Sequence, residues 1–232
     1  MLMNSASTTP AQPLVLGDDR YRIVLNPSGT GYSSCQGWCT LTRDGADPLL
    51  DALGFFIYLR DLDSGAVWSP TPRPLGQNAT HHGFAADAQR ATFHQCNHDI
   101  TATLEVSLCP GASAELRRLR LQNTGTAPRR LDVTGYLEPV IFPTAADACH
   151  PAFAKLFVQT AFEPERQVLL VNRRARGHNE VFPWLVHGLS GPGELQYETD
   201  RKHFIGRGRS LADPAALGNS GQWAVVSGQR TE

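Results

Sequence analysis

Short apolar runs separated by turn signals recur along this chain and constrain its fold more than any other feature. Examples are Phe55–Leu59, Ile100–Leu108 and Leu116–Leu121, each of which is followed by a turn segment that contains glycine. Runs of this length between Gly-, Pro- or Asn-containing turns predict β-strands joined by hairpins. No helical period of apolar residues extends over three turns anywhere in the sequence. The pattern predicts an all-β fold in which antiparallel sheets stack into a sandwich.

The rest of the chain fits a single sandwich with few exceptions. Between residues 131 and 138 apolar side chains alternate with polar ones, as in a strand with one face in water. Asp147–Leu156 is the expected helical exception, and Pro70–Pro74 predicts an extended loop because proline fixes φ and lacks a backbone donor. We expect one domain over residues 20–232, preceded by a disordered leader over residues 1–19.

Charge and cysteine content narrow the function classes. The chain has 232 residues, with 21 Lys and Arg against 22 Asp and Glu, so it lacks the cation excess of a nucleic-acid binder. No segment reaches the roughly 20 apolar residues that span a bilayer, and the first sixteen residues lack the features of a signal peptide. Five cysteines without repeated tight spacing favour reduced thiols. We therefore expect a cytoplasmic protein that binds no nucleic acid and does not span a membrane.

Glu198–Arg209 is the most highly charged segment that also carries apolar and glycine residues. Charged residues flank the pair Phe204 and Ile205, and glycines at 206 and 208 let the backbone bend between arginines. One interpretation is a partly buried ion-pair lattice at an interface; the other is direct contact with a ligand that accepts bidentate hydrogen bonds. The residues assigned to the lattice are Glu198, Asp200, Arg201, Phe204, Arg207 and Arg209.

Residues that could bind a metal or act as a nucleophile do not form a convincing site. His94, Cys96 and His98 would share one strand face, but the paired cysteine spacing of a structural zinc site is missing. The sequence also lacks the Gly-x-Ser-x-Gly turn that presents a serine nucleophile. We expect no metal, no cofactor and no catalytic residue.

Three motifs in this order carry a resemblance to a known family: Asn26–Ser33, Ala146–Thr160 and Glu198–Arg209. Together they resemble the N-terminal β-sandwich of glycoside hydrolase family 94, which contains cellobiose and chitobiose phosphorylases. The branch of cyclic β-1,2-glucan synthase is the most similar. The resemblance implies an antiparallel two-sheet super-sandwich related to the galactose mutarotase-like fold.

The resemblance also implies a division of labour. In the family the catalytic acid and the phosphate-binding residues belong to a helical barrel that follows the sandwich, and this chain ends before such a domain could begin. It also implies that the sandwich packs on the barrel and shapes the active-site entrance of its own or a neighbouring subunit. The expected partners are therefore a helical-barrel catalytic domain or a second copy of the chain, and a β-linked glucan or oligosaccharide.

Sugar binding by a sandwich needs an aromatic platform with polar groups around it. Tyr32 and Trp38, which follow the glycine-rich turn at residues 26–31, are the aromatic candidates, and Arg173 and Arg174 are the basic ones. The leading hypothesis is a non-catalytic, carbohydrate-associated module of a family 94 type enzyme. Two alternatives stay open: an autonomous sugar-active enzyme such as an aldose epimerase, and a purely structural or oligomerisation domain.

Overall fold

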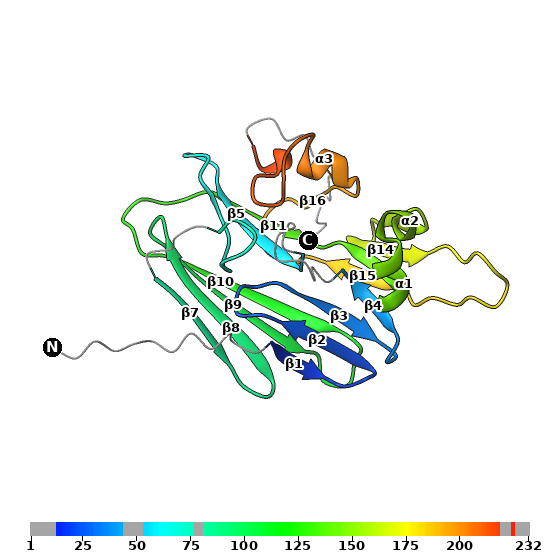
Figure 1. Cartoon of the computed structure of the whole chain (residues 1–232). Coiled ribbons are helices and arrows are strands. Elements are labelled where there is room, and N and C mark those ends of the chain that lie inside the picture. The colour runs from blue at the N-terminus through cyan, green and yellow to red at the C-terminus, as the bar shows by residue number, and fades with distance from the viewer. Residues whose placement is uncertain (1–12, 44–52, 77–80, 219–223, 226–232) are drawn as a thin grey trace.

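The computed structural model describes residues 13–43, 53–76, 81–218 and 224–225, and within them strands in antiparallel sheets predominate (Figure 1). One layer is a five-stranded sheet of order β1-β2-β3-β4-β12. Its strands are β1 (Leu14–Gly17), β2 (Tyr21–Leu25), β3 (Gly31–Cys35), β4 (Cys39–Thr42) and β12 (Pro139–Pro143).

Three further sheets supply the strands that face this layer. A four-stranded sheet has the order β10-β9-β8-β7, and two three-stranded sheets have the orders β11-β5-β6 and β13-β14-β15. Their bounds are β5 (Phe56–Asp61), β6 (Val67–Trp68), β7 (His81–Ala86), β8 (Arg90–Asn97), β9 (Ile100–Leu108), β10 (Glu115–Asn123), β11 (Leu131–Tyr136), β13 (Val158–Glu163), β14 (Val168–Arg173) and β15 (Leu185–Gly188). A short pair is formed by β16 (Gln196–Tyr197) and β17 (Ala224–Val225).

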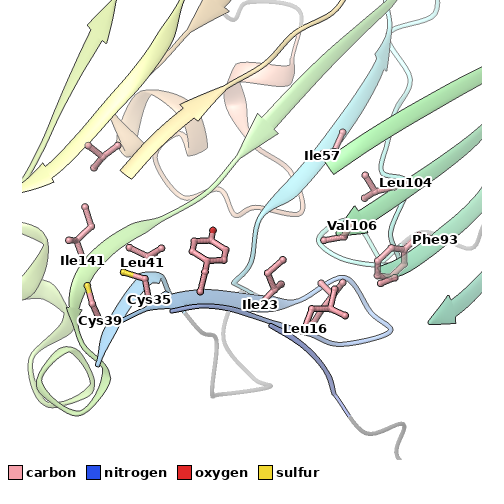
Figure 2. Close-up of a cluster of buried hydrophobic side chains, with 14 residues drawn as sticks. Leu16, Ile23, Cys35, Cys39, Leu41, Ile57, Phe93, Leu104, Val106 and Ile141 are labelled. Atoms are coloured by element: carbon pink, nitrogen blue, oxygen red, sulfur yellow. The ribbon is translucent and has the colours of Figure 1, made fainter. Parts of the chain in front are cut away.

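The main core lies between these layers because each strand turns alternate apolar residues inward. Figure 2 shows Leu16 and Ile23 of the blue strands directed towards Phe93, Leu104 and Val106 of the opposite sheet. All five side chains are buried. Two sheets that bury facing apolar sets in this way make a β-sandwich.

Short helices cover the ends and one outer face of the sandwich. They are α1 (Thr144–Cys149), α2 (Pro151–Lys155), α3 (Arg201–Ile205) and the 3₁₀ turn η1 (Ala215–Leu217). In α3 and η1 the residues Phe204, Ile205 and Leu217 form a second buried cluster with Phe56 and Tyr58 of β5. The segment that contains α3 and η1 therefore covers the face of β5 that points away from the main core.

The structure confirms most of the elements predicted from the sequence. Strand β9 has the predicted bounds, β10 contains the predicted run Leu116–Leu121, and helices α1 and α2 occupy the expected helical exception. Residues 70–76 contain no strand, as their prolines require, although they form bends and turns rather than an extended loop.

Two predictions need correction. Part of the expected leader, Leu14–Gly17, is strand β1 and pairs with β2, because Leu16 fits the core; residues 1–12 of that leader lie outside the described residues, as do residues 219–223 and 226–232 of the expected domain. The prediction that one face of the strand at residues 131–138 lies in water is wrong at the C-terminal end of the strand. Tyr136 and Glu138 are buried there because helix α3 packs over them.

Candidate functional site

The charged motif Glu198–Arg209 folds as a capped short helix with one buried side. Asp200 is the N-cap of α3, and its carboxylate accepts a hydrogen bond from the backbone N–H of Lys202 at 2.7 Å. Phe204 is buried and stacks on Tyr136 with ring centroids 4.7 Å apart. Gly206 ends the helix at a φ of 87°, a conformation that favours glycine.

Glu138 is the charged centre onto which this helix docks. Its carboxylate lies 2.6 Å from Nε of Arg201 in α3 and 3.2 Å from Nζ of Lys155 in α2. The hydroxyl of Tyr136 donates a third hydrogen bond at 2.9 Å. Glu138 is only 7% exposed, so these contacts compensate for the loss of water around its charge. We call these four residues the Glu138 centre.

The surroundings of Glu138 keep its carboxylate ionised. Burial alone would raise its pKa, but the hydrogen bond from Arg201, the charge of Lys155 and the hydrogen bond from Tyr136 outweigh burial, so the pKa lies below its usual value. A general acid for glycoside cleavage must hold a proton, which needs a raised pKa. The ionised Glu138 joins helices α2 and α3 through its ion pairs with Lys155 and Arg201.

A second ion pair fixes α1. Arg43 donates from Nη2 to Asp147 at 2.6 Å, and both side chains are largely buried. The backbone of Arg43 also donates to the carbonyl of Glu138 at 2.9 Å. Asp147 is thus bound to a guanidinium close to the Glu138 centre.

The predicted lattice is not a set of mutual pairs. Arg209 pairs with Asp213 at 2.5 Å, and Arg201 pairs with Glu138, which is 63 residues away in the sequence. Arg207 is exposed, and within the described part of the chain no ion pair involves it. Charge patterning could not show this, because the partner of Arg201 comes from a distant strand end.

Arg173, predicted to contact sugar, is buried in the structure. Arg173 is 3% exposed, and its guanidinium lies 3.8 Å from the ring centre of Phe142 and donates to the carbonyl of Ala154 at 2.9 Å. The rings of Phe157 and Phe182 lie 5.2 and 5.6 Å from the same guanidinium. This cation is enclosed by aromatic rings and cannot reach a sugar in this conformation.

Two of the rings around Arg173 contact aromatic residues that are exposed at the surface. Phe182 lies 6.3 Å from Trp38, which is 41% exposed, and Phe157 contacts Phe153, which is 49% exposed. We call the whole row the aromatic–arginine strip; it consists of Trp38, Phe182, Phe142, Arg173, Phe157 and Phe153.

Exposed cations border one end of the strip. Arg174 and Arg176 are both exposed, and their guanidinium groups lie 5.6 and 5.4 Å from the ring of Phe157. Tyr32 does not join the strip, because it lies at the start of β3 whereas Trp38 lies in the loop that follows the end of β3. Of the four predicted sugar contacts, Trp38 and Arg174 are therefore available at opposite ends of the strip.

Sequence reasoning missed Phe142 and Phe182 and gave no role to Lys155. The signal for Lys155 was present, since it lies in the motif Ala146–Thr160 that carries the family resemblance. No signal marked the two phenylalanines, because their shared contact with Arg173 joins three separate segments of the chain.

A cavity lies elsewhere, at the hairpin ends between the sheets. It has a volume of about 570 Å³, and its lining includes Arg90, Glu105 and Arg118. Glu105 lies 3.8 Å from Arg90 and 3.5 Å from Arg118, so its charge partly neutralises the two cations. The cavity contains none of the predicted site residues.

Two features are absent from the described residues. Groups of three or more His, Cys, Asp or Glu side chains arranged to hold a metal ion were not found among them. Their helices are also too short to cross a membrane.

The sequence of this chain also matches a known protein family. The family model for the supersandwich domain of glycosyl hydrolase 94 matches residues 1–230. This chain belongs to that family. The fold it implies agrees with the antiparallel sheets described above, and the resemblance seen in the three sequence motifs is confirmed.

The curated relatives are longer proteins with sugar-related names. The cyclic β-(1,2)-glucan synthase of Rhizobium meliloti is 36% identical over 212 residues, which cover 89% of this chain and 7% of that protein. The N,N′-diacetylchitobiose phosphorylase of Vibrio furnissii is 26% identical over 208 residues, which cover 88% of this chain and 26% of that protein. The matched region therefore makes up only 7% and 26% of the length of these two relatives.

Proposed function

We propose that this supersandwich domain is a non-catalytic module that contacts β-linked glucans for an enzyme of the glycosyl hydrolase 94 type, such as a cyclic β-1,2-glucan synthase or a glycoside phosphorylase. The observation that carries the proposal is the aromatic–arginine strip. Both ends expose an aromatic ring, and exposed guanidinium groups border the end at Phe157. Rings suit the apolar faces of pyranoses, and guanidinium groups suit their hydroxyl groups. The 36% identity to a glucan synthase supports a glucan as the ligand.

The non-catalytic part of the proposal rests on the described acids near the strip. Glu138 and Asp147 are each held within 2.6 Å of a guanidinium nitrogen, and the hydrogen bond of Arg201 and the charge of Lys155 keep the pKa of Glu138 low. A carboxyl group with a lowered pKa, as at Glu138, is a poor proton donor to a glycosidic oxygen.

A binding measurement tests the carbohydrate contact. Linear β-1,2-linked glucooligosaccharides are titrated into the chain while heat or tryptophan emission is followed. We expect binding that Trp38→Ala weakens by about 3- to 10-fold, the equivalent of one stacking contact. Trp184→Ala is the matched control, because Trp184 is 65% exposed and none of its ring contacts joins the strip within the described structure. Equal weakening by both substitutions, or no binding at all, argues against the strip as the site.

Turnover assays separate the alternatives. The chain should release no glucose 1-phosphate from β-linked glucobioses with phosphate, relative to a heat-inactivated control. Epimerisation of an aldose by the purified chain would favour an autonomous enzyme instead. A purely structural or oligomerisation domain predicts no response to saccharides. Sedimentation of the chain alone would detect self-association, and sedimentation with a separately expressed helical-barrel partner would detect complex formation. The expected cytoplasmic location stays a prediction that fractionation of the source cells would test.

A further inference from the structure

Two buried thiols lie directly opposite each other at the base of one hairpin. Cys35 is the last residue of β3, Cys39 is the first residue of β4, and the register of the two strands pairs them. Both residues are free cysteines and both are buried. Figure 2 shows both sulfur atoms on the side of the sheet that faces the main core.

The geometry of this pair fits a disulfide. Directly opposed residues of antiparallel strands have Cα atoms about 4.5–5.5 Å apart, within the range of about 4.4–6.8 Å that disulfides require. The two thiols are also close enough to influence each other's pKa. The register therefore places both side chains within reach of an S–S bond.

We propose that Cys35 and Cys39 form a thiol–disulfide modification site whose co-reactant is a small-molecule disulfide such as oxidised glutathione. One cysteine thiolate attacks a sulfur of the co-reactant, which releases one thiol and leaves a mixed disulfide. The second cysteine thiolate then attacks the protein sulfur and releases the second thiol. Each cysteine loses its proton, the protein pair is oxidised by two electrons, and the co-reactant is reduced to two thiols.

Burial makes this exchange slow but its product durable. Burial raises the pKa of Cys35, and burial together with the neighbouring Cys35 raises the pKa of Cys39 to about 12, so little thiolate is present at neutral pH. The same high pKa values make both sulfurs poor leaving groups once the disulfide has formed. The site therefore responds to sustained oxidation and not to brief exposure.

The loop between the cysteines supplies a route for the co-reactant. Gln36, Gly37 and Trp38 are exposed, and the backbone N–H groups of Gln36 and Gly37 donate to the carbonyls of Arg20 and Asp19 at 3.3 and 2.7 Å. Breaking these two hydrogen bonds lifts the loop without unfolding the sheets. Trp38 lies in this loop and forms one end of the aromatic–arginine strip. The disulfide would therefore restrict the backbone that positions Trp38.

The test uses the full chain with 5,5′-dithiobis(2-nitrobenzoate), itself a disulfide, as the probe. In a Cys96→Ser, Cys109→Ser, Cys149→Ser background, only Cys35 and Cys39 can react. We expect about two equivalents of thionitrobenzoate to be released per native chain, with no adduct retained in the mass spectrum. Adding Cys39→Ala to this background should reduce the release to about one equivalent and leave one stable adduct.

Two outcomes overturn the proposal: stable adducts on both cysteines, or no reaction of the folded background chain under conditions in which the unfolded chain reacts. Circular dichroism establishes that each variant is folded. If the serine or alanine variants fail to fold, wild-type chain treated with oxidised glutathione gives the answer. Cleavage after the four tryptophans should then leave fragments 1–38 and 39–68 joined until a reductant is added. No glucan enters these measurements, so the result is independent of the proposed function.

Discussion

The Glu138 centre gives the sharpest prediction for stability. Arg201→Ala removes the 2.6 Å contact with Glu138 but leaves Lys155 and the Tyr136 hydroxyl in place. Breaking a fully buried ion pair costs about 3–5 kcal/mol, and losing an exposed pair costs about 0–1 kcal/mol. The side chains of Arg201 and Glu138 are 46% and 8% exposed. We therefore expect an intermediate loss of about 1–2 kcal/mol in the free energy of unfolding.

The control lies six residues further along the same segment. Arg207→Ala removes an exposed guanidinium, and we expect a change within about 0.5 kcal/mol. Urea unfolding followed by circular dichroism at pH 7 measures both variants, and the slope m should be equal in the two. Equal stability of the Arg201 and Arg207 variants would refute the assignment of Glu138 as the charge that holds α3.

The pH dependence of the same centre has a definite sign. The folded-state pKa of Glu138 is lowered from 4.5, because the Arg201 hydrogen bond and the other contacts outweigh burial, which by itself raises it. Its ionised form therefore contributes stability above pH 4.5, and this contribution is lost as the pH falls through the lower folded-state value. The stability difference between wild type and Glu138→Gln should be constant near neutral pH and shrink in acid. A difference that grows in acid would contradict the sign.

Three further substitutions test the packing. Gly206→Ala should cost about 1–3 kcal/mol more than Gly208→Ala, because both have positive φ but only at Gly206 would the new Cβ meet a neighbour, Ala215 at 2.6 Å. Phe204→Ala should cost about 3–5 kcal/mol by leaving a cavity against Tyr136. Arg173→Ala should cost about 2–4 kcal/mol through lost ring contacts, whereas exposed Arg174→Ala should be nearly neutral. Chemical unfolding measures the cost of each substitution. Equal costs of the two glycine variants, equal costs of the two arginine variants, or a negligible cost of Phe204→Ala would contradict the corresponding argument.

Local sequence rules decided the strands and turns. The run Ile100–Leu108 alternates buried and half-buried residues because its side chains point to opposite faces of a sheet. Pro151 at the first position of α2 likewise fits a helix start that needs no backbone donor. Both outcomes depend on neighbours in the sequence, so the sequence alone predicts them. The turn before β9 was not predicted: β8 ends at Asn97, and His98, expected on one strand face with His94 and Cys96, lies in a tight turn with Asp99, where both residues have positive φ.

The ion pairs depend on the tertiary structure and not on local sequence. Arg201 and Glu138 are 63 residues apart, and no local rule distinguishes Arg201, which is paired with a buried acid, from Arg207, which is exposed. The alternation at residues 131–138 predicted water around Tyr136, but α3 covers that face instead. The wet and dry faces of a strand depend on what packs against them, which the strand itself does not encode.

By itself, the sequence determined a β-sandwich of the glycosyl hydrolase 94 family, because strand periodicity and turn chemistry are local and because the three motifs are specific. Only the tertiary structure decided that Arg173 is buried while Trp38 and Arg174 reach the surface. Phe142, Phe157 and Phe182, the rings that enclose Arg173, come from separate parts of the chain. A buried cation is stable only when such groups converge on it, and that convergence exists only in the folded sandwich.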